Sequence, residues 1–384
     1  MMWERVKLAD VSDSCLGKML DQRKNKGIYK PYLANVNVRW GAFDLDNLQE
    51  MKFEDDEDER YGIKYGDLII CEGGEPGRCA IWKEQLPNMK IQKALHRLRV
   101  NEEMDYRYVY YWFLLAGKQG ALKQYYTGAT IMHMPGQKLK EVVIDKPPLD
   151  VQRKIGDYLE AFDDLIENNQ KQIKLLEEAA QRLYKEWFVD LRFPGYEDVE
   201  IVDGVPEGWE ITPINMVANL KAGGDKPKTF SEKMTNENKI PVFANGITGK
   251  GLMGFTDKAV INNPSVTISA RGTVGVVFLR TEPYVPIVRL ISVTPIEDKV
   301  DILYLYLYLI NQNFRSTGAA QQQITVPLLK SKNIICPTDD VRKSFNDVIT
   351  SIFNKIDILE KHINKLTEAR DRLLPKLMNG EIEV

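Results

Sequence analysis

The sequence is poor in the residue types that most often build catalytic and metal centres. Its 384 residues include three histidines and four cysteines: His96, His133, His362, Cys15, Cys71, Cys79 and Cys336. No histidine has cysteine or carboxylate neighbours at the spacing of a zinc site, and three scattered histidines give no basis for a catalytic triad. The chain also lacks a Gly-x-x-x-x-Gly-Lys-Ser/Thr phosphate loop and a glycine-rich turn for a nucleoside cofactor. These absences predict a protein that is not an enzyme and that holds no metal or cofactor.

Long apolar runs are missing as well. The longest, from Ile302 to Ile310, is nine residues and is too short to cross a bilayer. The first residues have no apolar core of the kind found in a signal peptide. The four cysteines have no regular spacing, which suits reduced thiols rather than a disulfide framework. We therefore expect a cytoplasmic protein that does not contact a membrane.

The sequence has no excess of basic residues. Lysine and arginine number 52 against 55 aspartates and glutamates, a formal net charge of −3. This average does not indicate a nucleic-acid-binding protein, but acidic clusters such as residues 54–59 can mask local basic faces. The hydrophobic content of 43% is that of an ordinary globular protein, and the length predicts more than one core.

The most regular stretch runs from Asp150 to Leu191 and is rich in Leu, Glu, Lys, Gln and Ala, which are good helix formers. Its apolar residues recur at intervals of three and four: Ile155, Leu159, Phe162, Ile166, Ile173, Leu176, Ala180, Leu183 and Trp187. This spacing is typical of a coiled-coil seam, which Asn169 interrupts once. Because a helix with one apolar stripe is unstable alone in water, the stretch needs a partner.

The partner lies in the same chain, 190 residues further on. Residues 340–377 repeat the pattern with Val341, Phe345, Ile352, Ile356, Leu359, Ile363, Leu366 and Leu373. The match extends upstream, where Tyr126-Thr127-Gly128-Ala129 corresponds to Ser316-Thr317-Gly318-Ala319. So long a period indicates duplication of a whole domain plus helix, since solenoid repeats span only about 20–50 residues. We expect the two helices to pair antiparallel, with Trp187 beside Phe345.

The sequence thus predicts an α+β fold with an internal two-fold repeat, in which two mixed, mainly β domains are separated by two long antiparallel coiled-coil helices. The expected boundaries are a first domain at 1–147, a helix at 148–191, a linker at 192–206, a second domain at 207–337 and a second helix at 338–378. Both domains contain a strand, a glycine turn and a returning strand, at 68–71 with 79–82 and at 265–269 with 276–279. Further expected elements are helices at 106–122 and 302–309 and a strand at 32–38.

Basic and amide side chains on turns and loops are the candidates for a binding site, because Arg, Asn and Gln can read base edges while Lys holds phosphates. In the first domain they are Arg23, Lys24, Lys26, Lys30, Asn37, Arg39, Arg78, Lys93, Arg97, Arg99 and Gln137. In the second they are Lys226, Lys228, Asn245, Arg271, Thr273, Arg289, Arg315, Gln321, Gln322 and Gln323. A solvated surface is the alternative for each residue taken singly. Arg78 and Arg271 beside the same turn in both copies favour contact with DNA.

Several short motifs together resemble the DNA specificity subunits of type I restriction–modification systems, over essentially the full length. They are the start of the first helix at 147–155, its end at 183–188, residues 66–69, the turns at 72–78 and 270–275, and the segment 373–382. The resemblance implies two target recognition domains, each of which reads one half of a split site in double-stranded DNA. It also implies that the helices dock two modification (methyltransferase) subunits, and that restriction (motor–nuclease) subunits join in the full complex.

Two other classes of protein remain open. A coiled-coil adaptor with protein-binding end domains would show no salt-sensitive affinity for DNA. A self-contained DNA enzyme would methylate or cleave DNA without partners. The duplication carries an expectation of its own, namely that a fragment of residues 1–205 pairs with a second copy of itself through the exposed seam and forms a two-fold dimer.

Overall fold

The computed structural model describes residues 3–21, 25–296, 298–312, 314 and 323–384. It divides into two compact units. The first comprises residues 1–169 and 361–384, and the second comprises residues 170–360. The first unit therefore combines two separate parts of the chain, whereas the second is one continuous stretch. No helix in the described ranges has the length and apolar character needed to span a membrane.

Three antiparallel or mixed sheets, beside the short pair of β4 (Val38–Arg39) and β5 (Ala42–Phe43), form the β-structure of the first unit. The first is a pair, β1 (Glu4–Lys7) with β11 (Val143–Lys146). The second has the order β2 (Ser12–Leu16), β10 (Leu95–Val100), β7 (Leu68–Cys71) and β8 (Cys79–Ile81). The third has the order β6 (Gln49–Phe53), β3 (Ile28–Leu33) and β9 (Lys90–Ile91), with β3 and β9 parallel.

The second unit repeats these three sheets strand for strand. Its pair is β14 (Glu210–Pro213) with β22 (Asn333–Cys336). Its larger sheet has the order β15 (Ala218–Ala222), β21 (Leu290–Pro295), β18 (Ser265–Ser269) and β19 (Val277–Arg280). Its third sheet has the order β17 (Leu252–Thr256), β16 (Ile240–Phe243) and β20 (Val285–Pro286), again with one parallel pair. The two domains are therefore copies of one fold, as the 190-residue repeat predicts.

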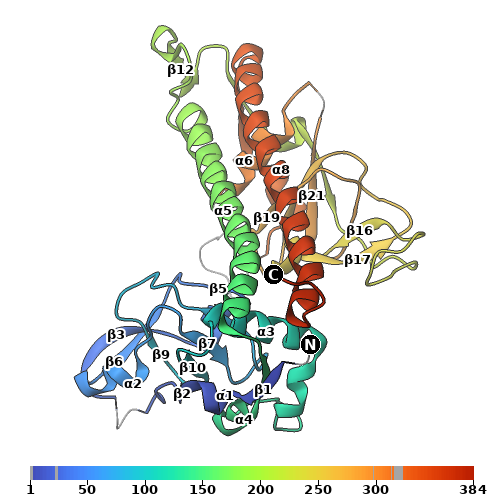
Figure 1. The fold of residues 1–384 in the computed structure, drawn as a ribbon. Coiled ribbons are helices and arrows are strands. Elements are labelled where there is room, and N and C mark those ends of the chain that lie inside the picture. Colours follow the sequence, from blue (N-terminus) through green and yellow to red (C-terminus); the bar gives the residue numbers. More distant parts are fainter. Residues whose placement is uncertain (1–2, 22–24, 297, 313, 315–322) are drawn as a thin grey trace. The chain divides into compact units, whose positions relative to one another are not determined.

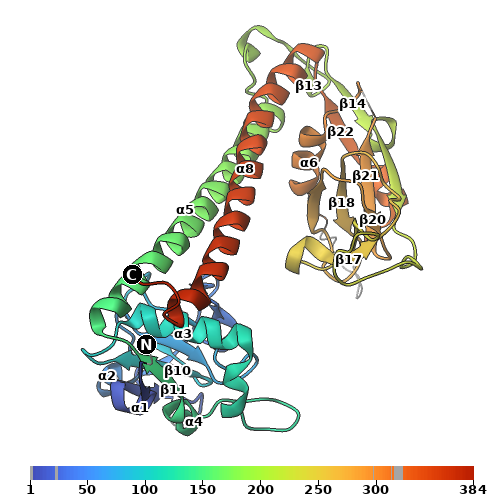
Figure 2. The same ribbon diagram turned by 45° about the vertical axis from the view of Figure 1, so that its right-hand side comes forward.

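A helix covers the larger sheet in each copy, α3 (Tyr106–Gln119) in the first unit and α6 (Ile302–Ile310) in the second, where Figure 2 shows it beside β18 and β21. Asp105 begins α3 by accepting hydrogen bonds from two backbone amides, and Gly120 ends it in a left-handed conformation. A tyrosine fixes each helix to the strand that follows it: the hydroxyl of Tyr108 donates to the carbonyl of Asp145, and that of Tyr304 donates to the carbonyl of Ile335. Both predicted helices are confirmed, and the same contact holds both.

Shorter elements complete the units. They are α1 (Leu8–Val11), α2 (Asp58–Tyr61), α4 (Gly136–Glu141), α7 (Val326–Lys330), the pair β4 (Val38–Arg39) and β5 (Ala42–Phe43), and the hairpin β12 (Ile201–Val202) and β13 (Val205–Pro206). The strand predicted at 32–38 is wrong in its position. It ends at Leu33, and residues 35–37 form a 3-10 turn because the Asn37 side chain accepts a hydrogen bond from the backbone amide of Ala34.

Two 40-residue helices, α5 (Leu149–Phe188) and α8 (Asp339–Met378), contribute to both units (Figure 1). In the second unit the rings of Trp187 and Phe345 lie 5.5 Å apart, which confirms the predicted antiparallel pairing. In the first unit Leu159 of α5 and Leu374 of α8 are buried in one core. The fold class predicted from the sequence is correct in its two mixed domains, its long helices and its internal repeat.

One polar contact distinguishes the two helix pairings. In the first unit Asp163 of α5 forms an ion pair with Arg370 of α8 and accepts a hydrogen bond of 2.8 Å from the buried hydroxyl of Tyr111. The repeat places Phe353 and Ala180 at the equivalent positions of the second unit, where Ala180 is buried in the apolar core and the partly buried Phe353 packs against it. The two halves of the duplication therefore present different chemistry to their partner helices at this level.

This difference modifies the expected self-pairing of residues 1–205. In such a dimer each Asp163 would face Ala180 of the other copy, and its carboxylate would lose Arg370. An unpaired polar group in a partly buried position costs about 1–3 kcal/mol, and the symmetric dimer contains two. We expect fragments 1–205 and 206–384, mixed in equal amounts, to form the unlike pair, and Asp163→Ala to tighten the self-dimer of the first fragment roughly tenfold or more.

Light scattering and sedimentation would measure these associations. Asp164→Ala is the matched control, because the neighbouring carboxylate is exposed. A self-dimer that Asp163→Ala and Asp164→Ala strengthen equally, or not at all, would show that Asp163 does not select the partner.

Candidate nucleic-acid interface

The turn from β7 to β8 in the first unit and the turn from β18 to β19 in the second have the same backbone structure. In the second unit the amide of Ser269 donates to the carbonyl of Val276 at 2.9 Å, and the amide of Gly275 donates to the carbonyl of Ser269 at 2.9 Å. In the first unit the amide of Cys71 donates to the carbonyl of Arg78 at 2.8 Å and that of Gly77 to the carbonyl of Cys71 at 2.9 Å. Glycine is required at Gly77 and Gly275 because φ is positive there, +88° and +81°.

An asparagine holds this turn in each unit. Asn245, just after β16, donates from its side-chain amide to the carbonyl of Arg271 at 2.7 Å. Asn35, just after β3, donates in the same way to the carbonyl of Gly73 at 3.0 Å. Asn35 was not among the residues predicted from the sequence. The signal is an Ala-Asn pair after each strand, but the two pairs are 210 residues apart rather than 190, so the constant shift does not align them.

Two further segments reach the turn of the second unit. The amide of Ala270 donates to the carbonyl of Arg289 at 2.8 Å, and the amide of Ile324 donates to the carbonyl of Ala270 at 2.9 Å. These bonds bring Arg271, Arg289 and Gln323 together around a hollow of about 390 Å³. All three side chains are exposed. Three candidates that are far apart in the sequence thus line one surface depression.

The first unit has the same backbone frame with other side chains. The amide of Glu72 donates to the carbonyl of Ala94 at 3.0 Å, and the amide of Met134 donates to the carbonyl of Glu72 at 2.7 Å. The positions of Arg271, Arg289 and Gln323 are therefore taken by Gly73, Ala94 and His133. A common frame with different side chains is what two different specificities require.

Arg78 is not the counterpart of Arg271, although both lie in the equivalent turn. Its backbone takes the position of Val276, at the far end of the turn. Its guanidinium donates to the carbonyl of Asn35 at 3.1 Å and to Glu75 at 3.2 Å. Arg78 therefore braces the turn from one side. The prediction that Arg78 and Arg271 are equivalent is wrong, and what the two turns share is their backbone structure.

Four candidates are held within the first unit. Arg97 is 4% exposed, and its guanidinium pairs with Asp13 at 2.6 Å and donates to backbone carbonyls of residues 59 and 60. Arg99 makes two hydrogen bonds of 2.7 Å to the buried Asp67. The side chain of Asn37 bonds to the backbone of residues 34 and 44, and Lys30 pairs with Asp58 at 2.7 Å. Sequence spacing could not separate these side chains from surface ones, because their partners are distant in the chain.

The remaining described candidates are at or near the surface. The exposed ones are Lys26, Arg39, Lys93, Gln137, Lys226, Lys228, Arg271, Arg289 and Gln323, while Asn245 and Thr273 are partly buried in the turn. Lys226 lies 3.4 Å above the ring of Phe230, and Arg39 pairs with Asp44 at 3.3 Å. Arg23, Lys24, Arg315, Gln321 and Gln322 lie outside the described residues. Within the described ranges, no group of three or more His, Cys, Asp or Glu side chains is placed to hold a metal ion.

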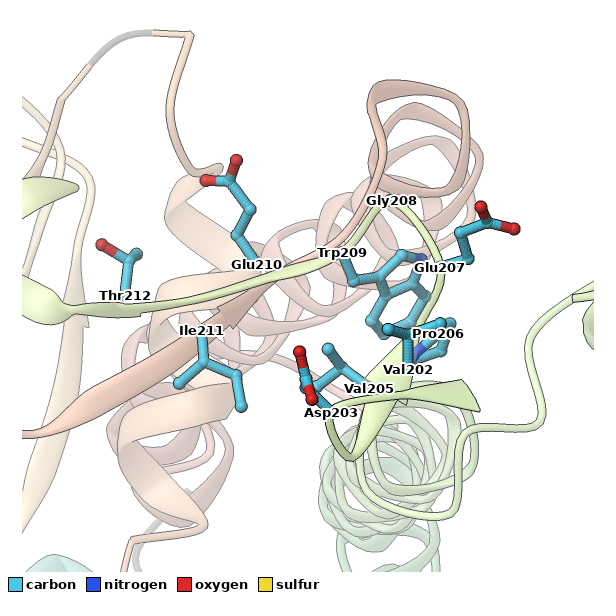
Figure 3. Close-up of a pocket in the computed structure, with 10 residues that line it drawn as sticks. All are labelled: Val202, Asp203, Val205, Pro206, Glu207, Gly208, Trp209, Glu210, Ile211 and Thr212. Atoms are coloured by element: carbon cyan, nitrogen blue, oxygen red, sulfur yellow. The ribbon is translucent and has the colours of Figure 1, made fainter. Parts of the chain in front are cut away.

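A second hollow of the second unit has the opposite character. It has a volume of about 490 Å³ and lies between the β12–β13 hairpin and β14. Figure 3 shows that Asp203, Glu207 and Glu210 belong to its lining, together with Trp209 and Ile211. None of its ten lining residues, all of them in the described part of the chain, is a lysine or arginine. Phosphates would be repelled there, so the candidate interface is the hollow beside Arg271.

The family model of the type I restriction modification DNA specificity domain matches residues 2–178 and 206–368. The MjaIX specificity subunit of a type I restriction enzyme of Methanocaldococcus jannaschii is 29% identical over 83% of this chain and 78% of its own length. The MjaVIII specificity subunit of the same organism is 24% identical over 100% of this chain and 93% of its own.

A solved structure supports the fold. The crystal structure of a type I restriction–modification S subunit from M. genitalium gives a TM-score of 0.59 at 18% identity and covers 98% of this chain and 96% of that chain. The chain belongs to the family of type I restriction–modification specificity subunits, because two copies of the family model match most of its length. Family membership, rather than any feature missing from the structure, confirms the prediction of a non-catalytic DNA specificity subunit.

A buried histidine lies behind the turn of the first unit. His96 is 1% exposed, and its Nε2 lies 4.0 Å from Oε2 of Glu72. Neither atom has a hydrogen-bond partner among the described residues. Burial lowers the pKa of His96, although the charge of Glu72 acts in the opposite direction.

We therefore predict an acid-sensitive contribution to stability. The pKa of His96 in the folded protein lies below its unfolded value of about 6.5. The unfolded chain takes up this proton first, so stability falls as the pH drops from about 6.5 through the folded pKa, with a slope of at most about 1.4 kcal/mol per pH unit. Urea unfolding between pH 7.5 and 5 should show a weaker slope for His96→Gln than for the wild type. Exposed His362→Gln is the control, and a slope that His96→Gln leaves unchanged would contradict the prediction.

Proposed function

We propose that each domain reads one half of a bipartite, asymmetric site in double-stranded DNA through its glycine turn, β7–β8 in the first unit and β18–β19 in the second. The observation that carries this proposal is the common frame: the same backbone bonds and the same asparagine hold turns that differ in their side chains. A fixed frame sets the approach of the protein to the duplex, while the side chains on it choose the bases. Two unlike sets of side chains would then read two unlike half-sites.

The second domain offers the clearer reading surface. Arg271 and Arg289 supply positive charge beside Gln323 at one hollow. Arginine pairs bidentately with guanine, and glutamine with adenine, in the major groove. The exposed Lys226 and Lys228 lie on the segment after β15, where they would hold phosphates. Lys26 and Lys93 are exposed in the first domain and would do the same there. The bases of the second half-site would be set by Arg271, Arg289 and Gln323.

The helices would hold the two domains at the spacing of the half-sites and dock the modification subunits. Tyr158 of α5 and Val348 of α8 support this role. They are equivalent positions of the repeat, 190 residues apart, and each is exposed on its helix, by 56% and 46%. Exposed apolar residues repeated in both copies fit two copies of one partner, so we propose two modification subunits. Restriction subunits would join this assembly, which acts on DNA in the cytoplasm.

The adaptor and the self-contained enzyme make different predictions. An adaptor would show no salt-sensitive affinity for DNA, and an enzyme would modify DNA alone. Co-purification of this chain with its modification subunit, followed by mapping of methylated sites in a host genome, separates the three. Methylation of a split site that needs both proteins supports the proposal.

Arg271→Ala tests the reading surface. Loss of one bidentate contact should reduce discrimination at the second half-site by about 1–3 kcal/mol, and the first half-site should be read as before. Arg271→Lys keeps the charge but loses the fork of donors, so it should also relax specificity. Arg182→Ala, an arginine 84% exposed on α5, is the control. Methylome sequencing gives the result, and equal loss at both half-sites would assign Arg271 to the fold instead.

Tyr158→Ser and Val348→Ser test the docking role. Burial of such side chains stabilises an interface by about 1.5–3 kcal/mol each, so each single variant should lose one modification subunit, and the double variant both. Light scattering of the purified complexes reports the mass. Met216→Ser, 60% exposed and outside both long helices, is the control. Single variants that each keep two modification subunits would exclude these residues from docking.

A further inference from the structure

The loop between α3 and α4 carries an exposed apolar tip. Thr127 and His133 exchange two backbone hydrogen bonds of 2.8 Å, and all residues between them are exposed. The tip presents Ile131 and Met132, whose exposed fractions are 65% and 45%. Figure 2 shows this stretch as a loop that stands clear of the rest of the first unit. Large apolar side chains at such a place gain nothing for the folded domain.

The base of the loop is tied to the turn that we assign to DNA reading. His133 bridges to Gly73, and the amide of Met134 donates to the carbonyl of Glu72 at 2.7 Å. The hydroxyl of Tyr126 donates to the carbonyl of Pro76 at 2.6 Å. These contacts come from both ends of the loop, so the position of the tip is set by the reading turn itself.

We propose that Ile131 and Met132 form a wedge that enters the base stack beside the first half-site and unstacks one base step. This rests on the proposed DNA-reading function. The tip is continuous with that surface, where Lys93 is exposed on the neighbouring loop and the amide of Glu72 binds the carbonyl of Ala94. A duplex offers apolar surface chiefly in its stacked bases, and isoleucine and methionine are among the side chains that proteins insert between them.

The wedge gives this non-catalytic chain a part in modification. An enzyme that methylates a base must first take that base out of the stack, and unstacking costs a few kcal/mol in free DNA. If the tip has already unstacked one base step, the free-energy cost of moving the neighbouring base into a modification subunit is lower. Recognition and opening of the duplex would then be coupled through one short stretch of backbone, from residue 126 to residue 134.

The test uses the full chain in complex with its modification subunit. The probe is a duplex that carries the site found by methylome sequencing, with 2-aminopurine placed singly along and beside the first half-site, outside the methylated position. The wild type should raise the fluorescence severalfold at one step. Ile131→Ser/Met132→Ser should remove that rise and keep binding to the site within about tenfold, while the conservative Ile131→Val/Met132→Leu should retain it. Ile211→Ser/Met216→Ser, exposed residues of the same types in the second unit, is the matched control.

Competition with a scrambled duplex in the same experiment separates the two proposals. If the wild type does not prefer the site, the reading function fails and the wedge fails with it. If the wild type prefers the site but shows no rise, or the serine variant keeps the rise, the wedge alone is overturned. Loss of the modification subunit from the serine variant would identify the tip as a protein contact, which also overturns the wedge.

Discussion

The structure depends on one constraint, that the apolar stripe of each 40-residue helix has to be covered by the other. Neither helix could remain exposed in water, because helical stability in proteins comes mainly from packing of the apolar face. The cores of both units extend into this seam: Ile155 and Leu159 join the first, and Trp187 and Phe345 the second. Each domain is thus built onto a helix pair that the chain can form only by returning on itself. This explains why both units combine residues from distant parts of the sequence.

The domains show how one fold can carry two different sets of turn side chains. Backbone hydrogen bonds fix the turn, the asparagine holds it, and a tyrosine ties the covering helix to the next strand, in both copies. None of these contacts involves the side chains at the outer positions of the turn. Gly73 and Arg271 can therefore differ without a change in the fold. The contacts that hold the fold and the side chains that we propose for DNA reading involve different atoms, so the side chains can vary while the fold is kept.

Sequence periodicity predicted the features that depend on local pattern. The long helices, the duplication, α3, α6 and the strands of the central turns follow from apolar spacing and glycine position, and the structure contains all of them. The strand near residue 32 was misplaced because a side-chain bond from Asn37 competes with the ladder. Candidate site residues were harder, because exposure depends on partners remote in sequence. Arg97 and Arg271 look alike in the sequence, yet Asp13, from another strand, holds Arg97 in place.

The Asp163–Arg370 pair bears on function as well as on stability. A duplicated chain whose halves pair equally well with themselves could assemble from like halves, and a two-fold dimer of the first half would present the same turn twice. Such a dimer would read an inverted repeat. The asymmetric site that we propose requires that unlike halves meet, and a charged contact present in one helix pairing but replaced by Phe353 and Ala180 in the other would provide that preference. Polar contacts of this kind are best known for fixing partner and register in coiled coils. The Asp163–Arg370 pair would therefore bear on the choice of partner more than on the strength of the pairing.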